Sequence, residues 1–485
     1  MNSSVTKLLP ESEHFAFEKS LASYPPRAFR FRPSLASAAP PMATFTVPWF
    51  PLGRVVESSK VRPSQFFHYV TGDYYIQDAG SMLALALLDV QPGEAICDLC
   101  AAPGGKATSI LESLAECNPD KLGGGWLLAN EPIRSRMPIL EYALARTGHL
   151  RYATLNNDPA EVAEKFAASF DAVLVDAPCS GQALVANEKH DASAFDQRHI
   201  DHNAARQRRI LLEAVRLLKP GGRIIYSTCT FAMEENEAQV EFLMREFPGA
   251  FEPIHLDSLS PWASRVTPGC YRLWPHRDPT AGAFAAGFRL VGEVPTKSRT
   301  EERHAPRKDA RWQERNATRR LNGSRPHGKN SETSDSLASS GLDLLSQFCI
   351  PIHVRARLLE NRVTAIAGDV LTNESLLYSR WPELLKKSGK HWEPQHALAV
   401  ANPTHLTHAY QIELTQAEVR NYLSGQAIPK KTSTQTRAGV IDTSSIKKVW
   451  CVATYNQKPI GWLKDAGNRF NNQLPRIAYH SFCTS

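Results

Sequence analysis

The sequence lacks long apolar runs. Among its 485 residues no stretch approaches the roughly 20 apolar residues that a membrane-spanning helix needs. Residues 1–18 include Lys7 but no apolar core, so we expect no signal peptide. Nine cysteines, spread over this length, do not form the pattern of a disulfide framework. We therefore expect a cytoplasmic protein with reduced thiols and no membrane partner.

The composition is that of a soluble globular protein. Hydrophobic residues make up 42% and charged residues 22% of the chain, and its length predicts two to four domains. The net charge of +7 mildly favours binding to polyanions and is consistent with an RNA partner, although many basic proteins bind no RNA. No internal repeat is present.

Changes in pattern along the chain predict four segments. Residues 1–74 are proline-rich and weakly periodic, which suggests an N-terminal RNA-binding extension of mixed α+β structure. Residues 75–295 are regular, and residues 296–340 are rich in Arg, Lys, Glu, Ser and Asn, with few large apolar residues. We interpret 296–340 as a basic, polar linker. It is either a solvated tether or an arm that touches RNA. Residues 341–485 read as a separate, β-rich domain.

Short apolar runs alternate with helical stretches in the regular segment. This alternation predicts a doubly wound, mostly parallel α/β sheet. Lys219–Gly222 is expected to end a helix and turn into the next strand. The expected strands are 95–99, 126–130, 152–155, 172–175, 223–227 and 284–290, and the expected helices are 105–115, 133–147, 160–168, 203–218 and 234–247.

Basic and aromatic residues alternate in the N-terminal extension, in the segment Pro25–Arg32. The alternation suits an edge strand whose arginines face RNA. It suits equally a half-buried strand with solvated arginines, and the sequence does not separate the two.

A glycine loop follows the first expected strand and opens a helix. It consists of Cys100, Ala101, Ala102, Pro103, Gly104, Gly105 and Lys106. The loop is neither the Gly-x-Gly-x-x-Gly fingerprint nor a phosphate loop. Its two glycines allow a ligand to approach the backbone, and the helix N-terminus favours an anionic group. A tight structural turn is the alternative.

Two acidic residues strengthen the ligand interpretation. Glu131 follows the second strand, where a carboxylate can accept both ribose hydroxyls, and Asp158 follows the third, near the place of an adenine amine. Each alone is more often a helix N-terminal charge. Together, at successive strand ends, they favour an adenosine cofactor.

Two cysteines follow the last two parallel strands. Asp176-Ala-Pro-Cys179 comes after the fourth strand and Thr228-Cys229 after the fifth. Neighbouring parallel strands bring both thiols, with the carboxylate of Asp176, to one crevice. A single cysteine at such a place is usually inert. The convergence of two with a cofactor loop favours a catalytic pair.

A further cysteine pair, Cys97-x-x-Cys100, could be a redox pair or half of a zinc site. No second Cys/His pair with zinc spacing follows. We expect both to be structural and expect no metal.

At these residues the sequence resembles the Nop/Sun, or Fmu-like, RNA cytosine-C5 methyltransferases, which use S-adenosylmethionine. The resemblance covers about the middle half of the chain. It rests on Tyr75–Asp78 with Ser81-Met82, Cys100–Lys106, Asp176–Gly181, Lys219–Gly222, Ser227–Phe231 followed by Glu234–Glu237, and Arg272–His276.

The tail is similar to that of the bacterial subgroup F, which modifies 16S ribosomal RNA, and this region resembles a PUA-like RNA-binding fold. The matching pieces are Glu393–Ala399, Gly461–Lys464, Asn471 and Pro475-Arg476. Among them Trp462, Lys464, Asn471 and Arg476 resemble an RNA-facing element, although a packing role for Trp462 suits the pattern as well.

The resemblance implies a Rossmann-like class I methyltransferase sheet that binds S-adenosyl-L-methionine through Cys100–Lys106, Glu131, Asp158 and Asp176. It assigns attack on carbon 6 of cytosine to Cys229 and release to Cys179, with Asp176 hydrogen-bonded to the base. The target base must be flipped out or single-stranded. DNA cytosine methyltransferases carry their nucleophile in a Pro-Cys context, which here would be Cys179.

Ribosomal RNA, either free or within a small-subunit particle, is the expected partner of a monomeric enzyme. Transfer RNA, large-subunit ribosomal RNA and a non-catalytic role in ribosome assembly stay open as alternatives. Two departures from the family pattern concern RNA contacts. Gln182–Glu188 replaces a run that usually contains Gly, Met and Phe before a basic residue, here Lys189, and Arg30-Phe31-Arg32-Pro33 replaces Arg-x-Asn.

Overall fold

The computed structural model describes residues 7–116, 125–187, 192–293, 341–352, 354–359, 361–366, 379–402, 406–408, 410–430, 433–436, 439–442 and 449–479. The predicted linker 296–340 and Lys189 lie outside these residues. Within them, no helix is both long and apolar enough to cross a membrane.

The N-terminal extension is a helix followed by a small antiparallel sheet. Its strands follow the order β2-β3-β1-β4. The elements are α2 (Glu11–Leu21), β1 (Ala28–Phe31), β2 (Thr44–Val47), β3 (Phe50–Val56), α3 (Phe67–Val70) and β4 (Tyr74–Ile76).

Strand β1 lies inside this sheet, between β3 and β4, and all four of its residues are buried. Both interpretations of the Arg-Phe alternation are therefore wrong for Arg30, whose side chain is fully buried. Arg30 is buried because its guanidinium pairs with the carboxylate of Glu112 at 2.5 Å and donates to Thr108 Oγ1 at 3.1 Å. A buried arginine is tolerated when its charge and donors are matched in this way.

The central segment forms the doubly wound, mostly parallel sheet that the sequence predicts. The strand order is β10-β12-β9-β8-β5-β6-β7, with β11 paired to β12. Strands β5 to β9 run parallel, while β12 is antiparallel to β9. The strands are β5 (Ala95–Asp98), β6 (Trp126–Asn130), β7 (Tyr152–Leu155), β8 (Phe170–Asp176), β9 (Leu218–Thr228), β10 (Phe251–Pro253), β11 (Cys270–Leu273) and β12 (Ala283–Leu290).

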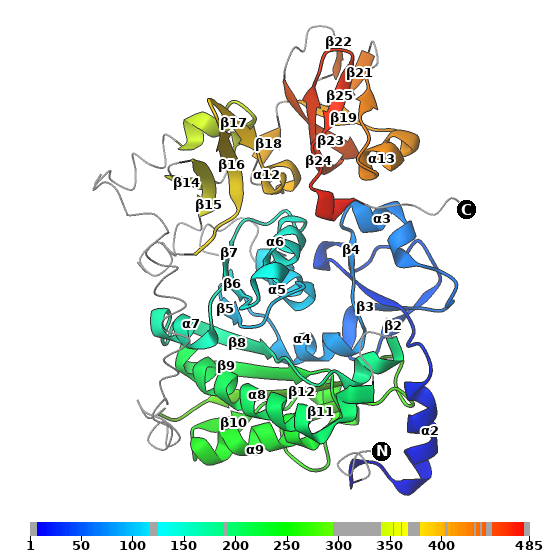
Figure 1. Ribbon diagram of the computed structural model, residues 1–485, viewed down its shortest axis with the longest axis vertical. Helices are drawn as coiled ribbons and strands as arrows, with labels where there is room; N and C mark the ends of the chain where they lie inside the picture. Colours follow the sequence, from blue (N-terminus) through cyan, green and yellow to red (C-terminus); the bar gives the residue numbers. More distant parts are fainter. Residues whose placement is uncertain are drawn as a thin grey trace.

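Helices cover both faces of this sheet (Figure 1). Residues of α4, α5 and α6 belong to the core on one face, and residues of α7, α8 and α9 belong to the core on the other. The helices are α4 (Leu83–Leu88), α5 (Gly105–Glu116), α6 (Met137–Ala145), α7 (Pro159–Lys165), α8 (Gln197–Leu217) and α9 (Glu237–Glu246).

Several helix boundaries differ from the expected ones, and the start of α8 differs most. Helix α8 begins at Gln197 rather than at 203, because the Asp196 side chain caps it by accepting from Arg198 N. The Lys219–Gly222 turn is part of β9, which begins at Leu218 directly after α8 ends.

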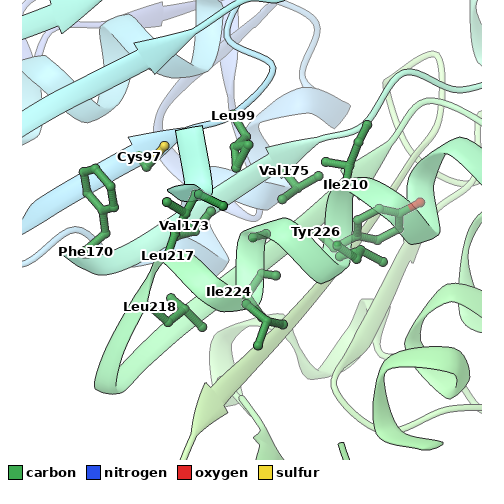
Figure 2. Close-up of a cluster of buried hydrophobic side chains, with 14 of the residues drawn as sticks. Cys97, Leu99, Phe170, Val173, Val175, Ile210, Leu217, Leu218, Ile224 and Tyr226 are labelled. Atoms are coloured by element: carbon green, nitrogen blue, oxygen red, sulfur yellow. The ribbon is translucent and has the colours of Figure 1, made fainter. Parts of the chain in front are cut away.

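The strands that carry the site are apolar on both sides. Figure 2 shows Val173 and Val175 of β8 and Ile224 and Tyr226 of β9 packed with Leu217 of α8 and its neighbours. Parallel strands buried on both faces have no polar side to solvate, so they read as continuous apolar runs. This burial fixes the carboxyl ends of β5, β8 and β9 side by side.

The C-terminal part is β-rich, as expected, and contains two main sheets of order β14-β15-β16-β17 and β19-β23-β24-β25-β20. Smaller pairs join β13 to β18 and β21 to β22. The elements are β13 (Cys349–Pro351), β14 (Arg355–Leu359), β15 (Arg362–Ile366), β16 (Glu383–Ser388), β17 (His391–Pro394), α12 (His396–Val400), β18 (Leu406–His408), β19 (Gln411–Glu413), α13 (Gln416–Leu423), β20 (Ile428–Pro429), β21 (Ser433–Thr436), β22 (Gly439–Asp442), β23 (Trp450–Tyr455), β24 (Lys458–Asp465) and β25 (Arg469–Asn472).

This C-terminal part packs against the edge of the central sheet (Figure 1). Backbone hydrogen bonds of 2.8 and 2.9 Å join Thr154 of β7 to Arg380. The Trp381 ring stacks on Trp126 at 6.4 Å between centroids, and the Lys458 ammonium lies 2.5 Å from the Asp73 carboxylate.

Trp462 lies inside the C-terminal part. It is 2% exposed, and its indole N–H donates to the carbonyl of Gln395 at 2.9 Å. The RNA-facing interpretation of Trp462 is therefore wrong, and the packing interpretation is confirmed. The ring is buried because a large aromatic side chain contributes a large apolar area to the core. Lys464 remains 44% exposed at its side chain.

Candidate active site

The predicted site residues converge on one edge of the central sheet. Cys100–Lys106 follows β5, Glu131 follows β6, Asp158 follows β7, Asp176 ends β8 and Cys229 follows β9. Parallel strands in this order bring their carboxyl ends to a common crevice, which is where open α/β sheets bind ligands.

The two thiols lie next to each other. The Sγ atoms of Cys179 and Cys229 are 3.3 Å apart, and both side chains are partly buried. The hydrogen bond with Cys229, together with burial, raises the pKa of the Cys179 thiol well above its ordinary value. Cys179 therefore holds its proton, and we assign it as the donor to the Cys229 sulfur.

A buried carboxylate, Glu235, ties the two thiol loops together. It accepts from Ser180 N at 2.9 Å, from the Ser180 hydroxyl, and from Gln207 Nε2 at 2.9 Å. The Ser180 hydroxyl also lies 2.8 Å from Thr230 Oγ1. Ser180 follows Cys179 and Thr230 follows Cys229, so this network sets the separation of the two sulfurs. Sequence reasoning quoted Glu235 within a motif but gave it no role.

Asp176 lies between the cofactor loop and the thiols. Its carboxylate is 2.7 Å from the Lys106 ammonium and accepts from Ser227 Oγ at 2.8 Å. The side chain remains 37% exposed. It therefore has room for a further hydrogen bond, from a base or a ligand amine.

A pocket of about 190 Å³ opens beside these groups. Its walls include Asp176, Lys106 and Cys229, together with Asp78 from the segment before α4. Asp78 accepts from Gly80 N at 2.8 Å and from Thr280 Oγ1 at 2.9 Å, so it holds these two parts of the pocket wall together. Sequence reasoning assigned no role to Asp78.

The glycine loop has the backbone that a close-packed ligand loop requires. Gly104 has φ +113°, and a Cβ at this position would lie 2.8 Å from the Cβ of Ala143. Only glycine fits there. Helix α5 begins at Gly105, directly after the loop, so its first N–H groups have no carbonyl partner within the helix and can serve as donors to a ligand.

Glu131 and Asp158 each also hold the local backbone. Glu131 is buried, accepts from Ile133 N at 2.8 Å, and has its second oxygen 3.2 Å from Arg136. Asp158 caps α7 by accepting from Ala160 N at 3.0 Å and is otherwise exposed. Their contacts with ribose and adenine stay predictions.

A further carboxylate that sequence reasoning missed lies beneath the loop. Asp98, at the end of β5, is 1% exposed. Burial, then the charge of Asp176, raise its pKa to about 8, while Lys106 opposes the rise. Neither carboxylate oxygen of Asp98 has a hydrogen-bond partner among the described residues. Asp98 is therefore largely protonated at neutral pH.

The Cys97-x-x-Cys100 pair is structural in placement. Cys97 is fully buried in the core, and Cys100 is partly buried against it. Within the described ranges, no group of three His, Cys, Asp or Glu side chains could hold a metal ion.

Fold and site together define a Rossmann-like methyltransferase domain with two adjoining thiols. Residues 85–289 match the family model described as 16S rRNA methyltransferase RsmB/F, and residues 409–478 match the one described as the methyltransferase RsmF PUA domain. The two matches together span more than half of the chain. The chain belongs to the RsmB/F family of methyltransferases and carries the PUA domain of the F type.

Curated relatives and solved structures agree with this placement. The chain is 29% identical over 84% of its length to ribosomal RNA small subunit methyltransferase F of Citrobacter koseri, covering 78% of that protein. It is 36% identical to the protein of that name from Pectobacterium atrosepticum over 49% of each chain. The crystal structure of a methyltransferase homolog protein from Pyrococcus horikoshii matches with a TM-score of 0.50 and 25% identity, over 59% of this chain and 93% of that one.

Proposed function

We propose that this protein transfers a methyl group from S-adenosyl-L-methionine to carbon 5 of a cytosine in 16S ribosomal RNA, through a covalent bond between Cys229 and carbon 6. The observation that carries the proposal is the pair of sulfurs 3.3 Å apart beside the Asp176 pocket. A single thiol suffices for attack; a second at this distance suits a reaction in which the first must later be released.

The chemistry of the target explains the need for a thiolate. Carbon 5 of cytosine is a poor nucleophile, and addition of the Cys229 sulfur to carbon 6 turns the ring into an enamine that can take a methyl group at carbon 5. Asp176 would hydrogen-bond the base and hold it in the pocket. Release then removes the carbon-5 proton and returns the electron pair of the C6–S bond to Cys229.

Cys179 is the group best placed to assist release. Its proton must pass to solvent, which the partly buried side chain can reach, before the Cys179 thiolate can take the carbon-5 proton as a base. Attack by Cys229 prepares this step, because the hydrogen bond to Cys229 is the main cause of the raised Cys179 pKa. Once Cys229 is bonded to carbon 6, that cause is weakened and Cys179 ionises more readily.

The residues present fit the proposed cofactor. Gly104 leaves a close approach that a Cβ would fill, and the N-terminus of α5 offers backbone donors. Glu131 places a buried carboxylate after β6; one oxygen accepts from Ile133 N, and the other lies 3.2 Å from Arg136 in an ion pair but makes no hydrogen bond among the described residues. Cys100–Lys106, Glu131, Asp158 and Asp176 would hold the cofactor. When bound there, S-adenosyl-L-methionine supplies the methyl group.

The substrate part of the proposal rests on the names of the relatives. The direct test is methyl transfer from labelled cofactor to separated 16S ribosomal RNA, 23S ribosomal RNA and transfer RNA, followed by bisulfite sequencing of the labelled pool. Label at carbon 5 of one cytosine in 16S RNA is the expected result. Label in another pool would replace the substrate, and label on another atom would overturn the mechanism. Cys229→Ala, which should keep cofactor binding, is the control.

A further inference from the structure

A second groove, of about 340 Å³, lies beside the active-site pocket. Its walls come from α2, from the Tyr24–Pro26 segment that follows it, and from the stretch Pro275–Ala281 between β11 and β12. Its volume is within the range of roughly 300–1,000 Å³ of small-ligand clefts. Neither the family matches nor the predicted site residues include its N-terminal wall.

The groove and the active-site pocket share a wall. Ala281 lines both cavities, and Thr280, which lines the groove, donates to Asp78, which lines the pocket, at 2.9 Å. The two cavities are therefore neighbours along one wall of the molecule.

The lining has the chemistry of a nucleotide site. Tyr24 is 65% exposed, and the Arg27 guanidinium lies 5.9 Å from its ring centroid. Pro25, Pro26 and Pro275 add flat apolar surface. Lys19 is exposed and supplies a positive charge, while no carboxylate is among the residues that line the groove. Aromatic rings that stack bases, with a cation for the phosphate, are the usual elements of single-strand binding.

Helix α2 is held rigidly, so the groove is preformed. Glu13 of α2 pairs with His276 at 2.8 Å and with Arg277 at 2.5 Å. Phe17 packs edge-on against Phe231 and Trp274, with centroid distances of 5.0 and 5.5 Å. Phe231 lies two residues after Cys229. The groove wall is thus anchored to the loop that bears the nucleophile.

We propose that this groove binds the nucleotide next to the target cytosine, with its base stacked on Tyr24 and its phosphate beside Lys19. The inference rests on the proposed function, since it takes the pocket beside Cys229 as the cytosine site. It makes the N-terminal extension part of the RNA site through α2 and Tyr24, rather than through the Arg30 strand.

The test is a double-mutant cycle in which each protein variant is combined with each RNA variant. The probe is the RNA 5′-UUUUACAUUUU-3′, with two further versions in which the adenosine before or after the cytosine is replaced by an abasic linker. Dissociation constants are measured by fluorescence anisotropy. With the unchanged protein, one of the two replacements should weaken binding about 5- to 150-fold, the range of one base–aromatic stack. With Tyr24→Ala, the same replacement should change binding less than twofold.

Two variants serve as controls. Tyr24→Phe should restore the response to the abasic linker. Phe15→Ala removes an aromatic side chain of α2 that is 78% exposed and does not line the groove, so it should keep the full response. Lys19→Gln should make the salt dependence of binding shallower by about one phosphate contact.

The inference is overturned if neither replacement couples to Tyr24, or if the unchanged protein does not bind the probe. Its failure is distinguishable from failure of the proposed function. Methyl transfer to carbon 5 without coupling would support the proposed function but reject the groove as a nucleotide site. Coupling without methyl transfer would support the groove as a nucleotide site but reject the proposed function.

Discussion

The Cys179 thiol holds its proton tightly at neutral pH. The hydrogen bond between the two sulfurs, and then the partial burial of Cys179, raise the pKa of Cys179. An ordinary cysteine has a pKa of about 8.5. Cys179 is therefore a thiol at neutral pH, which is consistent with the proposed roles of Cys229 as the nucleophile and Cys179 as the group that assists release.

Cys229→Ala should lower the pKa of Cys179, because it removes the first cause of the rise and leaves only burial and nearby charge. The measurement is the pH dependence of Cys179 alkylation by iodoacetamide, followed by peptide mass spectrometry. The midpoint, not the rate, is compared, because the substitution also opens access to the sulfur. Since a raised pKa favours the protonated form, the midpoint in the variant should move to lower pH. An unchanged or higher midpoint would contradict the assigned hydrogen bond. Ser180 and Glu235 are unchanged in both proteins, so the loop geometry is matched.

At the scale of the elements, Glu235 positions the thiol loops. Its carboxylate receives three donors from Ser180 and Gln207, and its own carbonyl accepts from the Tyr226 hydroxyl at 2.6 Å. It touches neither sulfur. We therefore treat it as a positioning residue, whose loss changes the separation of the loops.

Glu235→Gln should lower kcat at least 10-fold while changing cofactor affinity less than twofold. The amide keeps the shape of the side chain but cannot accept from all three donors, so one buried polar group is left unsatisfied at a cost of about 1–3 kcal/mol in stability. Steady-state kinetics and thermal unfolding measure the two effects. Glu241→Gln, which changes an exposed carboxylate of the next helix, is the control. Equal losses in cofactor binding and kcat would show general disruption instead of positioning.

The central strands and the cysteine loops could be predicted from the sequence. Parallel strands buried on both faces read as continuous apolar runs, and the strands before the two cysteines each end in a recognisable sequence motif. Strand β1 does not follow from it. An arginine between two phenylalanines reads as exposed, and only Glu112, more than 80 residues further along the chain, explains its burial. The Glu235 network, the Asp98 site and the groove beside α2 depend on similarly distant contacts, which no local pattern carries.

At the scale of the whole molecule, the C-terminal part is docked on the methyltransferase domain. The composition of 296–340 predicted a tether, and nothing in that composition indicates docking. The interface involves β7, α6 and α3, through the Thr154–Arg380 backbone pairing, the stacking of Tyr142 on His396, and the ring contact of Phe67 with Tyr455. Removing residues 341–485 would therefore uncover apolar surface as well as remove RNA contacts.

Point substitutions separate these two effects. The hairpin of β16 and β17 carries the exposed Lys386, Lys387 and Lys390, and the Lys387 ammonium lies 6.0 Å from the Trp392 ring centroid. Changing the three lysines to Gln in the full-length protein should reduce the salt slope of 16S RNA binding by about one to two units, with cofactor affinity and thermal stability unchanged. Lys60→Gln, at an exposed turn of the N-terminal extension, is the control. An unchanged slope would place the RNA contacts of the tail elsewhere.

The central claim is that Cys229 attacks the base and Cys179 assists its release. The most direct measurement is a denaturing gel of Cys179→Ala incubated with S-adenosyl-L-methionine and 16S RNA, with the adduct mapped by mass spectrometry after nuclease digestion. If Cys229 attacks and Cys179 assists release, the gel shows a shifted band that carries a methylated cytosine on Cys229 and is absent from the Cys179→Ala/Cys229→Ala double variant. Normal turnover by Cys179→Ala without a shifted band, or an adduct on any other residue, would contradict it.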